Sequence, residues 1–339
     1  MSEIIEGTIL AGPDYEAIEG RVAIEGGEIA AIEEAGTDST DVVVPAFVNA
    51  HTHVGDSIAK EAGEGLSLTD LVAPPDGLKH RLLRDASRAE TVAAIRRSVS
   101  FMRASGTAVF LDFREGGVEG VETLREATAG SDVRGFALAR GSIEAMEAGD
   151  GFGAPSARDG EFEREREATR AAGKPFGIHA GERDPDDIDG AFDLDPDFLV
   201  HMVHPREEHL DRLAKQETPV VVCPRSNLVT DAGVPPIRDL AERTTVALGT
   251  DNVMLNSPSM FREMAFAAKL ADVSAREVLR MATRAGAEIA GLDCGLIEAG
   301  RPAKLLVLDG DSDTLAGARN AVRAVVRRAG VADVNRVVL

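Results

Sequence analysis

The chain has 339 residues, and its 58 acidic and 37 basic residues give it a formal net charge of −21. Such an acidic chain offers no net basic face for nucleic acid, and none of its apolar runs is long enough to span a membrane. The first residues lack the basic start and the apolar stretch of a signal peptide. We therefore expect a cytoplasmic globular protein, whose length suits a large fold such as an α/β barrel.

The acidic residues are spread along the chain, with concentrations at 161–167, 184–197 and 309–313. They could attract a cationic partner, or they could reflect a halophilic surface, because concentrated salt screens the repulsion between like charges. Their wide distribution favours the halophilic surface. Cys223 and Cys294 form no CxxC pair, so we expect them to be structural thiols.

The two ends of the chain have the pattern of β-strands, in which short apolar runs alternate with Gly-containing turns. Strands are predicted at 7–10, 20–24, 28–32, 304–308 and 324–328. We expect residues 1–45 plus 291–339 to form a small β-sandwich domain. Residues 46–290 would then form a central catalytic domain.

The central residues alternate apolar strands with helical stretches. The predicted strands are one that ends at His51, then 107–112, 133–140, a short run near Phe152, 175–179, 198–201, 220–223 and 245–251. Helices are predicted near 118–129 and 161–172. Eight alternating units of this kind predict a (β/α)8 TIM-type barrel, whose active site lies at the C-terminal ends of its strands.

Ionisable side chains gather at those predicted strand ends. They are His51 and His53 at the first strand, His179 followed by Glu182 at the fifth, His201 and His204 at the sixth, and Asp251 at the eighth. Only two of the seven histidines, His80 and His209, lie elsewhere, in predicted helices. Residues two apart on a strand point to the same side, so His51 and His53 can reach one ion.

Each of these features is weak alone, since an HxH sequence occurs by chance and an Asp after Gly-Thr often caps a helix. Together they match a catalytic metal site, in which imidazoles and a carboxylate hold the ion and one position stays open for water. His179 and Asp251 would supply the third and fourth protein ligands.

Several motifs resemble a known family. Val44-Pro45-Ala46-Phe47-Val48-Asn49-Ala50-His51-Thr52-His53 resembles the first-strand signature of the amidohydrolase superfamily, although the family often has Gly where Ala46 stands. The segments 179–182 (HAGE), 199–204, 223–227 and 248–252 resemble its aminohydrolase branch, which contains cytosine, guanine and adenosine-type deaminases and chlorohydrolases. Residues 291–305 resemble the family's return into its small β domain, so the resemblance covers nearly the whole chain.

The resemblance implies that His51, His53, His179 and Asp251 hold a divalent metal. Relatives with two metals carry a carboxylated lysine at strand four, but no lysine lies between Lys79 and Lys174, which favours a single ion. Nitrogen and oxygen ligands favour zinc, with iron or manganese as alternatives. The metal lowers the pKa of the water it binds from about 15.7 to about 7.

The resemblance also implies roles in proton transfer. Asp251 would accept a proton from the water, and Glu182 would protonate the ring nitrogen and later the leaving group. His201 would polarise the substrate or hydrogen-bond the attacking oxygen. His204 is a weaker candidate, with a surface or supporting position as the better interpretation.

Substrate contacts are predicted only weakly. Residues 55–83 should overhang the site. Arg114 and Arg140 follow the second and third strands and could bind a carboxylate or phosphate, but pairing with the protein's own acids is the favoured alternative. Asn227 has an equal claim to a structural role.

The leading hypothesis is therefore hydrolytic deamination of an amino-substituted N-heterocycle, such as a nucleobase or nucleoside. One alternative is hydrolysis of a cyclic amide or imidazolone-type ring C–N bond. A different class is a catalytically silent metal-binding scaffold. Family habit suggests a homodimer or a larger homo-oligomer.

Overall fold

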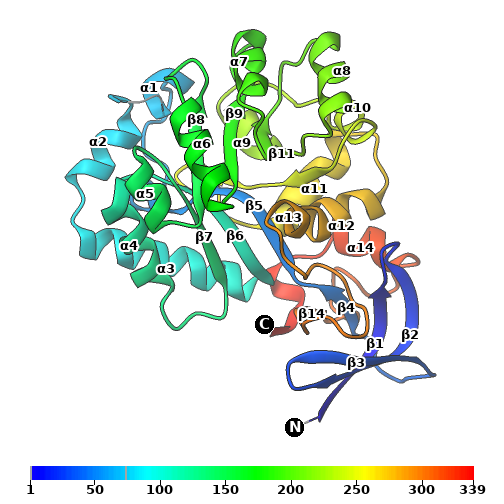
Figure 1. Ribbon diagram of the computed structural model, residues 1–339. Coiled ribbons are helices and arrows are strands. Elements are labelled where there is room, and N and C mark those ends of the chain that lie inside the picture. The colour runs from blue at the N-terminus through cyan, green and yellow to red at the C-terminus, as the bar shows by residue number, and fades with distance from the viewer. Residues whose placement is uncertain (1, 73–74) are drawn as a thin grey trace.

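The computed structural model describes residues 2–72 and 75–339 (Figure 1). Its larger sheet has nine strands in the order β12-β11-β10-β9-β8-β7-β6-β5-β13, and every pairing in it is parallel. These strands are β5 (Phe47–His53), β6 (Thr107–Arg114), β7 (Arg134–Ala139), β8 (Gly151–Ser156), β9 (Phe176–Ala180), β10 (Phe198–His201), β11 (Val220–Val222), β12 (Val246–Leu248) and β13 (Asp251–Asn252). The eight predicted strands, including the short one near Phe152, are confirmed.

The eighth predicted strand, 245–251, is interrupted. Only Gly249 and Thr250 separate β12 from β13, yet these two strands lie at opposite ends of the sheet order. Since β12 pairs with β11 and β13 pairs with β5, the sheet curls until its first and last strands meet. This α/β architecture is consistent with the predicted TIM-type fold.

Helices surround the curled sheet (Figure 1). They are α1 (Leu68–Val72), α2 (Leu78–Asp85), α3 (Arg88–Ala104), α4 (Gly117–Thr128), α5 (Ile143–Ala148), α6 (Glu163–Ala172), α7 (Ile188–Asp193), α8 (Glu207–Gln216), α9 (Pro224–Val229), α10 (Ile237–Ala241), α11 (Met260–Leu270), α12 (Ala275–Ala282), α13 (Arg284–Ile289) and α14 (Ala321–Arg327), with short 3-10 helices at Val54–Ala59, Pro185–Asp187 and Val331–Asp333. Within the described residues, 2–72 and 75–339, no helix is long and apolar enough to cross a membrane.

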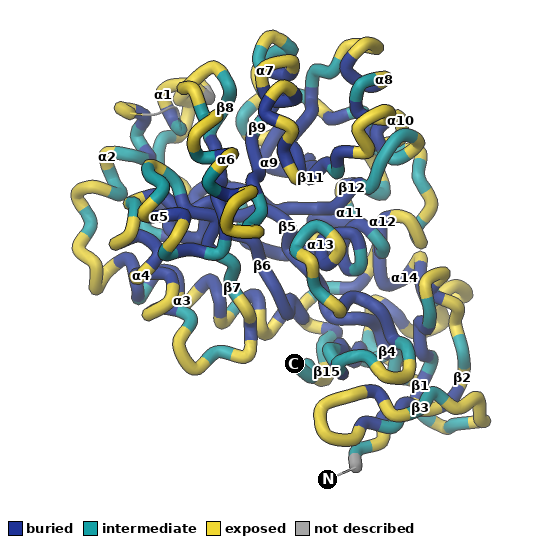
Figure 2. The backbone as a smooth tube through the Cα atoms, in the orientation of Figure 1, coloured by how far each residue is buried: buried dark blue, intermediate teal, exposed yellow. Residues whose placement is uncertain are grey.

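The core lies between the sheet and its helices, where the backbone tube is almost continuously buried (Figure 2). Phenylalanines fill much of it: Phe47, Phe110, Phe152 and Phe176 are all nearly inaccessible. The equally buried Phe113 instead packs against Phe198 and against the rings of His51 and His179. Full burial of one such side chain stabilises the fold by about 1.5–3 kcal/mol. The strand ends that carry the ionisable residues therefore project from a rigid base.

A second sheet joins the two ends of the chain, and both termini lie close to it (Figure 1). Its six strands have the order β15-β14-β4-β1-β2-β3, with bounds β1 (Ser2–Ala11), β2 (Glu16–Glu25), β3 (Glu28–Glu34), β4 (Val42–Pro45), β14 (Leu305–Leu308) and β15 (Val334–Val338). The chain ends do pair, in a single six-stranded sheet. The sandwich form and the division at residues 45 and 291 stay predictions.

The strand predicted at 324–328 is wrong, because these residues lie in helix α14 and just beyond it. The Asn320 side chain accepts a hydrogen bond from the Arg323 backbone N–H at 2.9 Å and so caps the helix. Val322, Val325 and Val326 are buried at the three- and four-residue spacing of a helix face. The run of valines suggested a strand, but the cap and this spacing override it.

Candidate active site

A cavity opens at the C-terminal ends of the strands of the curled sheet. It holds about 860 Å³ of empty space, part of it open to solvent. Its lining includes most of the predicted site: His53, Arg140, His179, Glu182, His201 and Asp251. The barrel rule therefore located the cavity correctly from the sequence.

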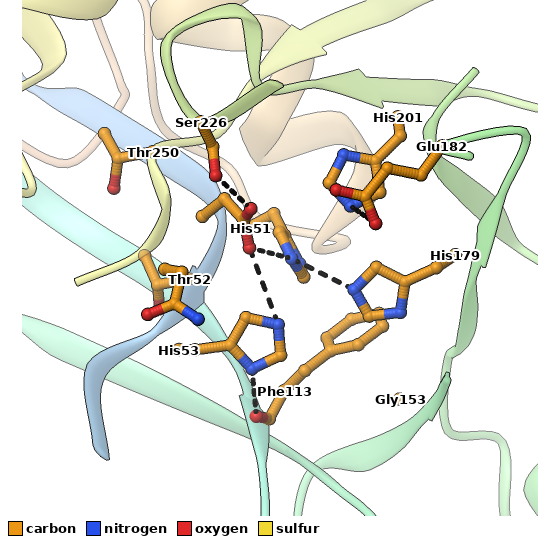
Figure 3. Close-up of polar contacts among 12 residues, drawn as sticks. His51, Thr52, His53, Phe113, Gly153, His179, Glu182, His201, Ser226 and Thr250 are labelled. Atoms are coloured by element: carbon orange, nitrogen blue, oxygen red, sulfur yellow. Dashed lines mark hydrogen bonds and ion pairs between the residues drawn. The ribbon is translucent and has the colours of Figure 1, made fainter. Parts of the chain in front are cut away.

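Three histidines point toward one another at the base of this cavity (Figure 3). His51 Nε2 lies 3.3 Å from His179 Nε2 and 3.2 Å from Asp251 Oδ1. His53 Nε2 lies 3.6 Å from the same carboxylate oxygen. His51, His53 and His179 form one group of possible metal-ligating atoms, and His51, His201 and Asp251 form another.

Backbone carbonyls orient two of the imidazoles. His53 Nδ1 lies 3.0 Å from Phe113 O, and His179 Nδ1 lies 3.0 Å from Ala154 O. A carbonyl oxygen only accepts hydrogen bonds, so each Nδ1 carries the hydrogen and each Nε2 presents a lone pair. This arrangement is the one that a metal ligand needs.

Burial keeps these histidines neutral. It lowers the pKa of His51 to about 4 and that of His53 to about 3, against the partial opposing effects of Asp251 and Glu115. Burial followed by the charge of Arg140 places the pKa of His179 well below its usual value. At neutral pH the cluster thus offers nitrogen lone pairs and one carboxylate, a donor set that fits zinc.

Asp251 is held by a clamp between the first and last strands. Asn49 Nδ2 donates to Thr250 Oγ1 at 2.7 Å, and the Thr250 backbone N–H donates to Asn49 Oδ1 at 3.0 Å. The adjacent Gly249 lies so close to His51 that an added Cβ would meet His51 Cβ at 2.7 Å. The site therefore needs an amide side chain at Asn49, which bonds to Thr250, and a residue without a side chain at Gly249.

The two strand ends that carry Asp251 and His201 have strained backbones. Their φ angles are +55° and +79°, in the left-handed region that side chains other than glycine rarely adopt. Such a conformation costs about 1–3 kcal/mol, and it clusters at functional sites. Ser226 Oγ donates to Asp251 Oδ2 at 2.5 Å and leaves Oδ1 facing the histidines.

Glu182 and His201 form a second pair on the cavity wall, beside the histidine cluster (Figure 3). Glu182 Oε2 lies 3.5 Å from His201 Nε2. Burial raises the pKa of Glu182, and His201 only partly opposes this shift. A carboxyl group that keeps its proton to higher pH is suited to act as a general acid.

Of the four residues predicted weakly to contact substrate, two lie at the cavity and two lie away from it. Arg140 lines the cavity, and Asn227 lies buried behind it, in contact with Glu182 and His201. Arg114 instead is buried 3.6 Å from Asp112 and does not line the cavity. His204 Nε2 donates to Ala232 O at 2.7 Å, also away from the cavity lining.

A buried charged group beside His53 was not predicted from the sequence. Lys79, from helix α2, contacts Asp56 at 2.9 Å and Glu115 at 2.8 Å. Glu115 Oε1 in turn lies 3.3 Å from His53 Nδ1 and 3.0 Å from Arg140 Nη1. Glu115 directly follows the second strand, so the strand-end rule could have found it, whereas no periodicity pointed to Lys79.

Known proteins resemble this chain over almost its full length. A family model described as the amidohydrolase family matches residues 42–336. A putative aminohydrolase of Methanothermobacter thermautotrophicus is 37% identical, over 91% of this chain and 91% of its own length. A 5-methylthioadenosine/S-adenosylhomocysteine deaminase of Halobacterium salinarum is 30% identical, over 92% of this chain and 85% of its own.

The fold is also shared with solved structures. An adenosine deaminase from Xanthomonas campestris with bound zinc superposes with a TM-score of 0.85 at 22% identity, covering 98% of this chain and 90% of its own. At that identity, the likeness supports the fold alone.

Proposed function

The chain belongs to the amidohydrolase family and is a hydrolase that acts on carbon–nitrogen bonds, and we propose that it removes the amino group of an N-heterocycle by hydrolysis. One observation carries this proposal: Glu182 and His201 stand on the wall of the same cavity as the histidine–aspartate cluster. The site thus pairs a proton donor with a place for a metal, as hydrolytic deamination requires.

We propose that one zinc ion is held by His51, His53, His179 and Asp251. Their facing lone pairs and single carboxylate fit this ion, and the carbonyls behind His53 and His179 fix the required tautomers. The Xanthomonas adenosine deaminase, which shares the fold, is described with bound zinc. When bound, the ion supplies Lewis-acid polarisation and lowers the pKa of water toward neutrality.

The residues of the chain would divide the proton transfers. Asp251 takes a proton from the attacking water at Oδ1, because Ser226 occupies Oδ2. Glu182, whose pKa burial raises, protonates the ring nitrogen next to the attacked carbon, takes up the proton of the added hydroxyl and passes it to the departing amine. The proton that Asp251 took from the water then returns to Glu182, so both carboxyl groups regain their starting states. His201 donates a hydrogen bond to the oxygen that adds to the ring.

The relatives support an amino-substituted purine ring as the substrate, because the Halobacterium relative carries the name of a deaminase of adenosine derivatives. We also propose that the protein's surface is adapted to concentrated salt, because its net charge of −21 comes from acidic residues spread along the chain.

The proposal is tested by loading purified protein with zinc and measuring ammonia release from a panel of nucleobases and nucleosides. We expect release from at least one aminated purine and none from the matching oxo compound. Opening of a cyclic amide without ammonia release would favour the ring-hydrolase alternative instead. Protein that binds the ion but neither releases ammonia nor opens a cyclic amide would favour the silent metal-binding scaffold.

A further inference from the structure

A buried ion pair joins helices α9 and α11. Glu263, from α11, is fully buried, and Arg225, from α9, is only 5% exposed. Arg225 Nε lies 3.5 Å from Glu263 Oε2, and the Arg225 backbone N–H donates to Glu263 Oε1 at 3.0 Å. One carboxylate thus binds both the side chain and the backbone of Arg225.

The guanidinium group of Arg225 also binds the segment 252–259. Its Nη2 donates to Ser257 O at 3.0 Å, and its Nη1 donates to Ser259 O at 3.3 Å. The planar fork of an arginine can reach two such carbonyl groups at once. Because this segment lines the cavity through Leu255, Arg225 holds part of the cavity wall from behind.

The two residues after Arg225 contact the functional groups of the site. Ser226 Oγ donates to Asp251 Oδ2 at 2.5 Å, and Asn227 Nδ2 lies 3.1 Å from His201 Nδ1. Both side chains belong to the first turn of α9, the turn whose backbone the buried carboxylate binds. A displacement of this turn would therefore move the partners of two residues that take part in proton transfer.

Asp251 needs support of this kind because its backbone is strained. Its φ of +55° lies in the left-handed region, and such a conformation persists only where the surrounding contacts hold it. The bonds between Asn49 and Thr250 hold the chain on its N-terminal side. The bonds from Arg225 to the backbone of the segment 252–259 hold the chain on its C-terminal side.

Stability alone does not account for the pair. The loss of hydration on burial offsets most of the attraction between two opposite charges, and apolar side chains of similar volume often stabilise a fold as well or better. Burial raises the pKa of Glu263 to about 7, although Arg225 opposes the shift, so the charge of this carboxylate is costly. The pair does supply directional bonds to a helix turn and to two backbone carbonyls.

We propose that Arg225 and Glu263 are positioning residues of the active site. By fixing the first turn of α9 and the segment 252–259, they set the positions of Asp251 and His201. This inference rests on the proposed function, because it concerns the residues that would transfer protons there. It makes the reaction depend on two side chains that do not line the cavity.

Two variants separate positioning from folding. The double variant Arg225→Met/Glu263→Met leaves no unpaired charge buried, so we expect it to fold. Arg225→Lys keeps the charge beside Glu263 but lacks the planar fork that spans the two carbonyls. Arg166→Met is the control, because Arg166 is also buried but pairs at 2.7 Å with Asp197. Asp197 binds the backbone N–H of Phe176 at the start of β9, so this pair lies at the end of the sheet opposite to the cavity.

The double variant should lose about tenfold to hundredfold in zinc affinity and in kcat, as is typical when groups that orient metal ligands are removed. Nitrogen NMR of labelled histidines should show a changed signal for His201 Nδ1, because Asn227 moves away from it. Arg225→Lys should change the same three quantities in the same direction by a smaller factor. Arg166→Met should lower Tm and change none of them.

The three quantities also distinguish positioning from a purely structural role. Wild-type zinc affinity, kcat and His201 signal in the double variant would overturn the proposal, and so would equal changes in Arg166→Met. If the double variant does not fold, Arg225→Lys decides in its place, and wild-type values in this variant would overturn the proposal.

Two of the readouts need no substrate, which separates this inference from the proposed function. Zinc affinity is measured by competition with a chelator, and the His201 signal is recorded on the zinc-loaded protein. If no aminated heterocycle is deaminated, the proposed function fails. Changes of both readouts in the Arg225 variants, and not in Arg166→Met, would still support the positioning role, while unchanged readouts would overturn it.

Discussion

Asn227 Nδ2 lies 3.1 Å from His201 Nδ1, and the same amide nitrogen lies 3.5 Å from Glu182 Oε1. A reversed amide would place its oxygen against the Glu182 carboxylate, so the nitrogen faces both partners. His201 Nδ1 therefore accepts a hydrogen bond, and His201 Nε2 carries a hydrogen toward Glu182 and the cavity. Asn227 acts as a positioning residue, because it selects the tautomer of His201.

Replacing Asn227 with Asp should reverse that tautomer, since a carboxylate accepts the hydrogen of His201 Nδ1. We expect kcat for deamination to fall by about a hundredfold or more, with an unchanged zinc content. Nitrogen NMR of labelled histidines would report the tautomer directly. Asn335→Asp, at an exposed position, is the matched control. An Asn227→Asp enzyme with normal kcat would contradict this role.

Glu182→Gln should remove the proton donor while keeping the shape of the side chain. We expect kcat to fall by about 10²–10⁴-fold. Because burial raises the pKa of Glu182, the wild-type rate should decline as the pH rises through that pKa and the acid loses its proton. A pH–rate profile of both enzymes checks this. If the rate of Glu182→Gln fell at high pH in the same way, the fall would come from a group other than Glu182.

His179→Ala should abolish zinc binding, because it removes one of the facing Nε2 lone pairs. Elemental analysis of the purified variant measures the loss. His80→Ala is the control, since His80 Nε2 contacts Val72 O and lies outside the cluster. Retention of a full equivalent of zinc by His179→Ala would remove His179 from the ligand set.

The metal-free protein should lose stability as the pH falls from about 6.5 toward 4. Burial lowers the pKa values of His51 and His53 to about 4 and about 3, below the value of 6.5 that they regain on unfolding. The unfolded chain then binds more protons in this window, so each histidine lowers the unfolding free energy by about 1.4 kcal/mol per pH unit. Denaturant titrations between pH 4 and pH 7 measure the slope, and a flat profile would refute neutral burial.

Salt should stabilise the protein if its acidic surface is halophilic. The net charge of −21 repels itself, and the screening length falls from about 10 Å at 0.1 M salt to about 3 Å at 1 M. We expect Tm to rise steadily as KCl increases over this range and beyond. A Tm that is independent of KCl would argue for the alternative, an acidic surface that attracts a cationic partner.

The strands and the main site residues could be predicted from the sequence because both obey local rules. Apolar runs mark buried strands, and a parallel barrel gathers the residues at the C-terminal ends of those strands on one side. This rule predicts that His179 and Asp251 lie near His51, as they do. Lys79 could not be predicted in this way, because it enters from a helix of the segment after β5 whose folding over the cavity depends on tertiary contacts. Arg114 obeyed the rule but turns toward Asp112.

The interruption at Gly249 and Thr250 places the cluster on the seam where the first and last strands of the curled sheet join. The hydrogen bonds between Asn49 and Thr250 span 201 positions of sequence. They therefore form only when the strands at the two ends of the sheet order come together. An ion shared by His51 and Asp251 would act there as a removable cross-link. Loss of the ion would then lower the free energy needed for local opening of the sheet at this seam. The seam would open before the rest of the fold unfolds.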